Sequence, residues 1–321
     1  MNQEQIKNVT IIGLGTMGPG LAQAFAVAGY QVTGFDANAA IWSQAQKIFQ
    51  ANLDSLREFG GLDPAEAEAA TTRFGWADTL AQAVENADLI VETVSEKRDI
   101  KRSVYAQIDQ HAPEDSLLWS NTSTMNIYDL LPPGRIPRSI IAHWFAPPHI
   151  IPLVEVVKDP RVAPNTVEVT LAILDKLGKK PIVIEKFVPG FIINRIQRIL
   201  GREMFFLLEG GYISPEDMDL AVKASIAPRM MLLGLVQRYD FTGLDLSARN
   251  LEDKEFFDPP LDNHPESLFS LVEQGHLGVK TGKGFFDYSD RELSDILRDR
   301  DRHLMQIIKS LDFFIRKERL V

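Results

Sequence analysis

The chain has 321 residues, of which 45% are hydrophobic and 24% charged, the composition of an ordinary folded protein. This length is long for one domain and comfortable for two. Its 44 acidic residues outnumber the 34 basic ones, so the formal net charge is -10. Because an acidic surface repels phosphate backbones and anionic lipids, we expect a small-molecule substrate and neither nucleic acid nor a membrane as partner.

Cysteine is absent from the sequence, which excludes disulfides, iron–sulfur clusters, zinc–thiolate sites and thiol nucleophiles. The longest apolar stretches fall short of the roughly 18 residues needed to cross a bilayer, and the N-terminus has no signal-peptide pattern. We therefore expect a soluble, cytoplasmic protein without a metal site. Its chemistry must come from other side chains or from a bound cofactor.

Short apolar runs alternate with longer amphipathic segments in the first half of the chain. The runs predict strands at 9–12, 32–35, 89–94, 116–119, 139–142, 153–157 and 181–184. The segments between them predict helices at 17–28, 39–59, 97–111 and 164–177. Strands separated by such helices form βαβ units, so we predict an α/β fold with a doubly wound, Rossmann-type, mainly parallel sheet.

The pattern changes near Pro189 and Gly190. Beyond them we predict helices alone, at 192–209, from Ser214 onward, at 268–273 and at 292–316. Ser214 is a favourable cap because a proline and two acids follow it in the first turn. We therefore divide the chain into a dinucleotide-binding domain at 1–187 and an all-helical domain at 188–321.

A glycine-rich loop follows the first predicted strand and opens the first predicted helix. Gly13, Gly15 and Gly18 form the pattern G-x-G-x-x-G, and Asp36 ends the next strand 23 residues after Gly13. Gly13 permits the tight turn, Gly15 lets a pyrophosphate approach the backbone, and Gly18 lets the helix pack close to the strand. Since the helix N-terminus offers free N–H groups to phosphates, we expect a bound dinucleotide.

Asp36 bears on which dinucleotide is bound. Its carboxylate would accept hydrogen bonds from a ribose diol and would repel a 2′-phosphate. The three residues that follow it include no arginine to hold such a phosphate. NAD is therefore favoured over NADP, while FAD, which uses the same fingerprint, stays an alternative.

Two residues at the edge of the predicted sheet suggest acid–base chemistry. His143 ends the apolar run 139–142, at the strand edge where doubly wound sheets bind ligands. Glu155 interrupts the apolar run 153–157, an expensive place for a carboxylate without a partner. For each residue taken alone, a structural role is about as good an interpretation as a catalytic role. Together they predict an imidazole–carboxylate pair that acts as a general base.

These residues together resemble the family of NAD-dependent 3-hydroxyacyl-CoA dehydrogenases, over nearly the whole chain. The motifs that carry the resemblance are Gly-Leu-Gly-Thr-Met-Gly at 13–18, Val-Glu-Thr-Val-Ser-Glu at 91–96, Ser-Asn-Thr-Ser at 120–123, Ala-His-Trp-Phe at 142–145, Leu-Val-Glu-Val at 153–156, Pro-Gly-Phe-Ile-Ile-Asn-Arg at 189–195 and Lys-Thr-Gly-Lys-Gly-Phe-Phe at 280–286. The resemblance implies reversible hydride transfer between NAD and the hydroxyl-bearing carbon of a 3-hydroxyacyl-CoA, in fatty acid metabolism.

The resemblance also implies roles for single residues. His143 would be the catalytic base and Glu155 its orienting partner, while Ser123 and Asn194 would hold the substrate oxygens. The residues expected to contact NAD are Gly13, Leu14, Gly15, Thr16, Met17, Gly18, Asp36, Glu96, Lys101, Ser123 and Lys280. The helical domain would form a homodimer. Taken alone, the loop that contains Ser123 is better explained as a strand-to-helix connection with a helix cap.

Several departures from the acyl-CoA members bear on the substrate. Ala146 replaces the asparagine of their His-Phe-Phe-Asn-Pro motif, and Asn52 and Phe59 stand where they have a serine and a lysine. Residues 51–70 contain a single cation, Arg57, among many acids. Since CoA carries several phosphate charges, the missing cations weaken the prediction of a CoA ester.

A subgroup acting on free hydroxy acids is also similar in places. It comprises gulonate dehydrogenases (lambda-crystallin), carnitine dehydrogenases and pyridine-carboxylate dehydrogenases of vitamin B6 breakdown, and the shared features include Pro147-Pro148 and the region of Arg229. Arg229 could clamp a substrate carboxylate or form a helix-start or dimer-interface salt bridge. We take the 3-hydroxyacyl reaction as the main prediction because the catalytic motifs are complete. A free hydroxy carboxylate substrate is the alternative, and a non-enzymatic, crystallin-like NAD-binding protein is a third possibility.

Overall fold

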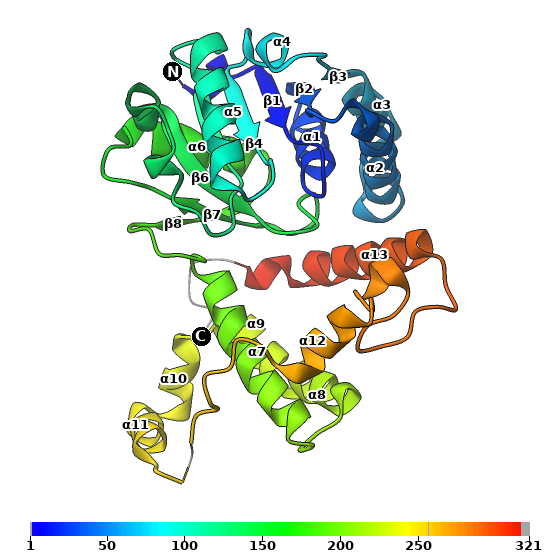
Figure 1. Ribbon diagram of the computed structural model, residues 1–321, viewed down its shortest axis with the longest axis vertical. Coiled ribbons are helices and arrows are strands. Elements are labelled where there is room, and N and C mark those ends of the chain that lie inside the picture. The colour runs from blue at the N-terminus through cyan, green and yellow to red at the C-terminus, as the bar shows by residue number, and fades with distance from the viewer. Residues whose placement is uncertain (1, 256, 316–321) are drawn as a thin grey trace. The chain divides into compact units, whose positions relative to one another are not determined.

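A computed structural model of the chain describes residues 2–255 and 257–315 (Figure 1). The chain folds into two compact units, Met1–Asn194 and Arg195–Val321.

An eight-stranded sheet forms the centre of the first unit, in the order β3-β2-β1-β4-β5-β6-β7-β8. Its strands are β1 (Asn8–Ile12), β2 (Gln31–Phe35), β3 (Phe74–Trp76), β4 (Leu89–Glu92), β5 (Leu117–Ser120), β6 (Ser139–Trp144), β7 (Leu153–Val157) and β8 (Lys180–Ile184). Neighbouring strands are parallel except for β6 and β7, which are antiparallel. The predicted doubly wound, mainly parallel sheet is confirmed.

Helices surround this sheet (Figure 1). They are α1 (Gly18–Val27), α2 (Trp42–Ser55), α3 (Pro64–Thr72), α4 (Leu80–Val84), α5 (Arg98–His111) and α6 (Pro164–Lys176). A π-helical turn, Leu56–Gly60, extends α2. Helices α3 and α4 and strand β3 are elements that the sequence did not predict. They are short, and α3 buries only Ala67 and Ala70, so its apolar periodicity is weak.

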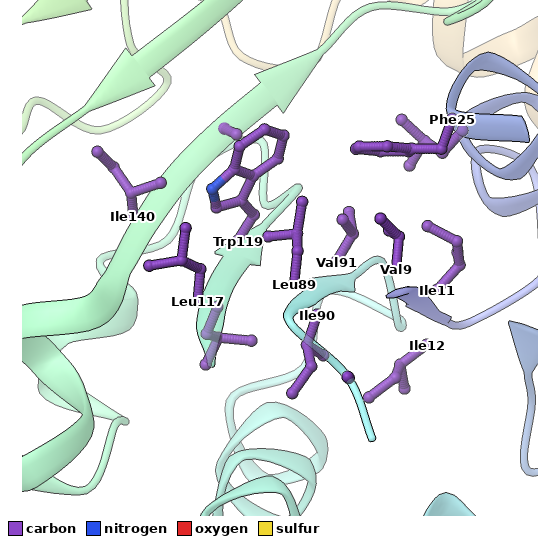
Figure 2. Packing of buried hydrophobic residues seen from close by; sticks show 14 of the residues in the cluster. Val9, Ile11, Ile12, Phe25, Leu89, Ile90, Val91, Leu117, Trp119 and Ile140 are labelled. Atoms are coloured by element: carbon purple, nitrogen blue, oxygen red, sulfur yellow. The ribbon is translucent and has the colours of Figure 1, made fainter. Parts of the chain in front are cut away.

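The core of the first unit lies on both faces of the sheet. Strands β4 and β5 are buried along their whole length, as expected for parallel strands covered by helices on both sides. Figure 2 shows part of this core, in which Phe25 of α1 lies against Trp119 of β5 with ring centroids 6.0 Å apart. The Trp119 indole also donates a hydrogen bond to Thr170 of α6 at 3.0 Å. This packing fixes the strand ends that carry the candidate site.

The second unit is helical, as predicted. Its helices are α7 (Ile193–Glu209), which begins in the first unit, and α8 (Pro215–Ala221), α9 (Ala227–Leu233), α10 (Gln237–Thr242), α11 (Leu244–Glu252), α12 (Glu266–Glu273) and α13 (Leu293–Leu311). Ser214 caps α8 by accepting a hydrogen bond from the N–H of Asp217 at 3.1 Å. Residue 316, the predicted end of the last helix, lies outside the described residues. None of the helices in the described ranges is long and apolar enough to span a membrane.

Candidate active site

The loop between β1 and α1 forms a cradle for an anionic group. Gly13 has a φ of 95°, and a Cβ on it would lie 2.7 Å from the carbonyl oxygen of Thr93. A Cβ on Gly18 would lie 2.2 Å from the carbonyl oxygen of Gly13, so neither position tolerates a side chain. A Cβ on Gly15 would meet no atom within 4 Å. The open space over Gly15, at the N-terminus of α1, fits a dinucleotide pyrophosphate.

Asp36 lies beside this loop, directly after β2. One carboxylate oxygen accepts a hydrogen bond from the N–H of Leu14 at 2.8 Å, and the other accepts one from the N–H of Asn38 at 2.9 Å. Thr16 is exposed and Met17 half-buried at the start of α1. Asp36 therefore holds the glycine loop in place and stands where a ribose hydroxyl would be bound.

His143 and Glu155 form a buried pair. They stand directly opposite each other in the antiparallel ladder of β6 and β7, so their side chains share one face of the sheet. The imidazole Nδ1 lies 2.8 Å from Oε2 of Glu155, and the side chains are 5% and 0% exposed. Because the carboxylate accepts the Nδ1 proton, the neutral ring has its lone pair on Nε2. This arrangement suits a general base.

The other oxygen of Glu155 binds the start of α7. Oε1 accepts hydrogen bonds from the N–H groups of Ile192 and Ile193, each at 3.0 Å. Phe191, directly before Ile192, is fully buried. Its φ of 51° is a conformation that few residues other than glycine adopt. Its ring centroid lies 5.3 Å from that of His143. The base is thus oriented by a carboxylate whose own hydrogen bonds are satisfied.

The loop after β5 wraps around the carboxylate of Glu96. Oε1 of Glu96 accepts hydrogen bonds from the Thr122 hydroxyl and from the N–H groups of Ser123 at 2.9 Å and Thr124 at 3.2 Å. Burial acts to raise the pKa of Glu96, but the Thr122 hydrogen bond and the charge of Lys101 outweigh it and hold the pKa below its usual value. An ionised Glu96 therefore fixes the loop that contains Ser123.

Two further contacts bring the predicted catalytic residues to one edge of the sheet. Oδ1 of Asn121 accepts a hydrogen bond from the N–H of Trp144 at 2.8 Å, which holds the loop beside the end of β6. Nδ2 of Asn194, in the first turn of α7, donates to the carbonyl oxygen of Ser123 at 3.4 Å. Asn194 directly follows Ile193, and His143 directly precedes Trp144. These two contacts and the hydrogen bonds of Glu155 therefore connect the loop after β5, the end of β6, β7 and the start of α7 in a closed ring.

Lys101, expected to contact NAD, lies in a buried cluster of charges. Its side chain is 1% exposed, and its ammonium is 2.7 Å from Oε1 of Glu92 and 3.3 Å from Oε2 of Glu96. The ammonium points from α5 toward the end of β4 because it compensates a carboxylate that is wholly buried there. The structure therefore gives Lys101 two carboxylate partners in the protein, and its contact with NAD stays a prediction.

Arg229 and Lys280 belong to the second unit. Arg229 is exposed on α9, where its guanidinium donates to the carbonyl oxygen of Ser225 at 3.0 Å and to the Ser225 hydroxyl at 2.8 Å. Lys280 is exposed in a short 3₁₀ turn, Val279–Thr281. Their contacts with substrate and NAD stay predictions. Across residues 2–255 and 257–315, no group of three or more His, Asp or Glu side chains is placed to hold a metal ion.

The sequence interpretation missed Glu92 and Tyr105. Glu92 ends the apolar run of β4, the same signal that drew attention to Glu155. The hydroxyl of Tyr105, one helical turn after Lys101, donates to Glu92 at 2.6 Å. A carboxylate at the end of an apolar strand, with a lysine and a tyrosine four residues apart on the next helix, could have indicated a buried cluster.

Comparison with known proteins gives matches over both units. The chain matches the family description "3-hydroxyacyl-CoA dehydrogenase, NAD binding domain" over residues 8–187 and "3-hydroxyacyl-CoA dehydrogenase, C-terminal domain" over residues 190–288. It is 34% identical to 5-formyl-3-hydroxy-2-methylpyridine 4-carboxylate 5-dehydrogenase of Mesorhizobium japonicum, over 96% of this chain and 99% of that protein. It is 32% identical to the mitochondrial hydroxyacyl-coenzyme A dehydrogenase of Rattus norvegicus, over 88% of this chain and 91% of that protein.

Among solved structures, the chain is similar to an enzyme described as 5-formyl-3-hydroxy-2-methylpyridine 4-carboxylic acid 5-dehydrogenase, an NAD+ dependent dismutase. The TM-score is 0.85 at 32% identity, and the match covers 96% of this chain and 99% of the other.

Proposed function

Because the chain belongs to the 3-hydroxyacyl-CoA dehydrogenase family of NAD-dependent oxidoreductases, we propose that His143 is the base of an NAD-linked alcohol dehydrogenase. The observation that carries this proposal is the 2.8 Å contact between His143 and the buried carboxylate of Glu155. A carboxylate on Nδ1 keeps Nε2 unprotonated and stabilises the imidazolium that forms when a proton is accepted.

In the proposed mechanism His143 removes the proton of the substrate hydroxyl. Bound NAD supplies the acceptor for the hydride that leaves the same carbon. Ser123 and Asn194 hold the substrate oxygen, a role supported by the 3.4 Å contact between Nδ2 of Asn194 and the carbonyl oxygen of Ser123. Glu155 holds the imidazole through one oxygen, while its second oxygen accepts from the two N–H donors at the start of α7. In the reverse direction, the imidazolium returns its proton to a ketone oxygen.

The residues of the first unit fit NAD. The glycine loop leaves open space over Gly15 for the pyrophosphate, and Asp36 stands beside the loop for the ribose diol. Glu96 adds a half-exposed carboxylate at the neighbouring loop. Lys280 of the second unit is a further candidate contact, based on the family motif at 280–286.

For the substrate we favour a free carboxylate over a CoA thioester. The segment formed by α2, its π-helical extension and α3 has one cation between residues 51 and 70, Arg57, which lies 3.4 Å from Asp54. This leaves little positive charge for the phosphates of CoA. A relative at 34% identity is named for a pyridine carboxylate, and Arg229 is the candidate clamp for such a group. The 3-hydroxyacyl-CoA reaction is the second candidate, supported by the rat relative.

We also infer the organisation of the molecule from the family. The NAD-binding domain takes residues 1–187 and the helical domain residues 188–321. Several large apolar side chains of the helical unit are exposed, among them Leu220, Val236, Phe241, Leu244 and Leu251. Exposed apolar surface of this kind supports a homodimer through the helical domain.

The test is NAD-linked turnover against two panels, one of 3-hydroxyacyl-CoAs and one of free hydroxy acids that includes gulonate, carnitine and pyridine carboxylates. We expect turnover in the free-acid panel. Turnover confined to CoA esters would overturn the substrate assignment. NAD binding without turnover in either panel would support a non-enzymatic, crystallin-like role.

A further inference from the structure

The segment that connects β6 to β7 leaves the sheet directly beside the candidate base. This segment, residues 145–152, is called the β6–β7 loop below; it begins two residues after His143 and ends three residues before Glu155. The ring of Phe145 is half-buried, and its centroid lies 4.6 Å from that of His143. Ala146 is exposed. The beginning of the loop is therefore accessible from solvent next to the base.

The middle of the β6–β7 loop packs against α1, the helix that follows the glycine loop. Pro148 is buried, and a Cβ on Gly20 of α1 would lie 2.7 Å from Cγ of Pro148. The proline ring can lie this close to the helix because Gly20 has no side chain. Gly20 is the third residue of α1, in the turn proposed to bind the pyrophosphate. One loop thus contacts both the base and the start of the cofactor helix.

The ammonium of Lys179 holds this loop. Lys179 lies between α6 and β8 and is 6% exposed. Its Nζ donates hydrogen bonds to the carbonyl oxygens of Pro148 at 2.6 Å and Ile151 at 3.0 Å. The same atom lies 5.0 Å from the centre of the Trp144 ring, which directly follows His143 in the chain. These contacts join the end of β6 to the middle and the end of the loop.

A buried ammonium is an unfavourable way to hold a loop. Both acceptors of Lys179 are neutral carbonyl oxygens, and burial lowers the pKa of Lys179 to about 8. At neutral pH the side chain is still an ammonium, whose three donors can bridge two carbonyl groups. A methionine would be easier to bury but could hold neither carbonyl. Local conflicts of this kind are concentrated at functional sites.

We propose that Lys179 is a positioning residue of the reaction, which holds the β6–β7 loop between His143 and the first turn of α1 and thereby aligns the base with the cofactor. The hydroxyl proton and the hydride leave adjacent atoms of the substrate, so a small displacement of either partner slows the reaction. This inference rests on the proposed role of His143 and on NAD binding at the glycine loop.

Hydrogen exchange of the NAD-free protein tests the tether without an activity assay. Inside the loop the N–H groups of Ile150 and Ile151 both donate to the carbonyl oxygen of Pro147 at 3.0 Å. In Lys179→Met we expect these amides to exchange about tenfold faster or more, because the loop opens more readily without its two hydrogen bonds to Nζ. Unchanged exchange of this segment would overturn the proposal.

Thr166→Val is the matched control. Thr166 is 3% exposed on α6, and its hydroxyl donates to the carbonyl oxygen of Pro137 at 2.8 Å. This variant also loses a buried hydrogen bond to a backbone carbonyl, but at a residue outside the β6–β7 loop. It should lower Tm by about 3 °C and leave both the exchange of the loop and kcat within about twofold of the wild type.

Kinetics separate alignment from cofactor binding. With an active hydroxy acid, Lys179→Met should lower kcat by about 10- to 100-fold, the effect of a displacement of about 1 Å. The Kd for NAD, from calorimetric titration, should stay within about threefold of the wild type. A weaker Kd with unchanged kcat would assign Lys179 to cofactor binding and overturn the proposal. Absence of turnover in the wild type would instead contradict the proposed function, and hydrogen exchange would still decide whether Lys179 holds the loop.

Gly20→Ala displaces the same loop from the side of the helix, and it covers the case in which Lys179→Met does not fold. Its methyl group would lie 2.7 Å from Cγ of Pro148, so the loop must move away from α1. We expect kcat to fall about tenfold. In the double variant the loss should be smaller than the product of the two single losses, because both changes displace one loop. Wild-type kcat in Gly20→Ala, or losses that multiply in the double variant, would contradict the proposal.

Discussion

The N–H of Ile193, the first residue of α7, donates a hydrogen bond to Oε1 of Glu155 at 3.0 Å. The same carboxylate orients His143 through its other oxygen at 2.8 Å. A single buried side chain therefore fixes both the candidate base and the start of the helix that contains Asn194. Changes at Glu155 should disturb catalysis and folding together.

Glu155→Gln tests this dual role. The amide keeps the volume of the side chain but removes the charge that stabilises the imidazolium. We expect kcat to fall by about 10²- to 10⁴-fold, the usual contribution of positioned acid–base groups. Since an amide oxygen satisfies the donors of α7 less well, the free energy of unfolding should fall by about 1 to 3 kcal/mol.

The control for this variant is Glu168→Gln, at an exposed position on α6. It should leave both kcat and the free energy of unfolding, measured in urea, close to their wild-type values. Full activity of Glu155→Gln would remove Glu155 from the mechanism.

Two glycines of the phosphate loop, the exposed Gly15 and the buried Gly18, should separate effects on NAD binding from effects on folding. A Cβ on Gly15 meets nothing within 4 Å, so Gly15→Ala should fold with nearly wild-type stability. Its methyl group would occupy the space expected for the pyrophosphate, so NAD affinity should fall about tenfold or more. Gly18→Ala would place its Cβ 2.2 Å from a carbonyl oxygen and should lose both stability and affinity.

Gly134→Ala is the matched control, because a Cβ there also meets nothing within 4 Å and the residue lies in a separate 3₁₀ helix. It should change neither the urea midpoint nor the Kd for NAD. Wild-type NAD affinity in Gly15→Ala would show that the pyrophosphate is bound elsewhere.

Features of the fold and the site that are set within a short segment could be predicted from the sequence, whereas features that depend on distant segments could not. The glycine loop and Asp36 are read from spacing, since their geometry is set within one βαβ unit. The pair of His143 and Glu155 was predicted because a carboxylate in an apolar strand requires a partner. The antiparallel register that joins them depends on how β6 and β7 pair across the sheet, which no local pattern specifies.

Lys101 has protein partners that the sequence did not predict. The family motif predicts a cofactor contact, which stays a prediction, and motif position does not determine which way a lysine side chain points. Its direction depends on Glu92, nine residues earlier and buried at the end of β4. Helix α3 was missed for a related reason, since two buried alanines give too little periodicity to be recognised.

Lys179 should make stability depend on pH. It is 6% exposed, and its ammonium donates to the carbonyl oxygens of Pro148 at 2.6 Å and Ile151 at 3.0 Å. Burial lowers the pKa of Lys179 to about 8, from 10.5 in the unfolded chain. Between these two values the unfolded chain binds a proton that the folded chain does not, so stability rises with pH across this window.

The measurement is urea unfolding of the wild type and of Lys179→Met at about pH 7.5 and about pH 10. The stability of the wild type relative to the variant should rise by about 2 to 3 kcal/mol between these two values. Lys180→Met, at the exposed neighbouring position, should show no such change relative to the wild type. A constant difference between the wild type and Lys179→Met would contradict the burial argument.

Arg229 distinguishes the two substrate classes. If the substrate is a free carboxylate, Arg229→Ala should lower kcat/KM by about 10- to 100-fold, because a charge-assisted bidentate contact is lost. Arg249→Ala is the control, since that arginine pairs with Asp245 on its own helix at 2.8 Å. Unchanged kcat/KM for a free acid in Arg229→Ala would exclude the clamp.

The central claim is that His143 takes the substrate proton. The most direct measurement compares wild type and His143→Ala in two assays, NADH formation with an active hydroxy acid and calorimetric titration of NAD. We predict that the variant keeps the wild-type Kd for NAD and loses about 10²- to 10⁴-fold in kcat. Turnover at the wild-type rate in His143→Ala would contradict the account, because the pair of His143 and Glu155 would then have no part in the reaction.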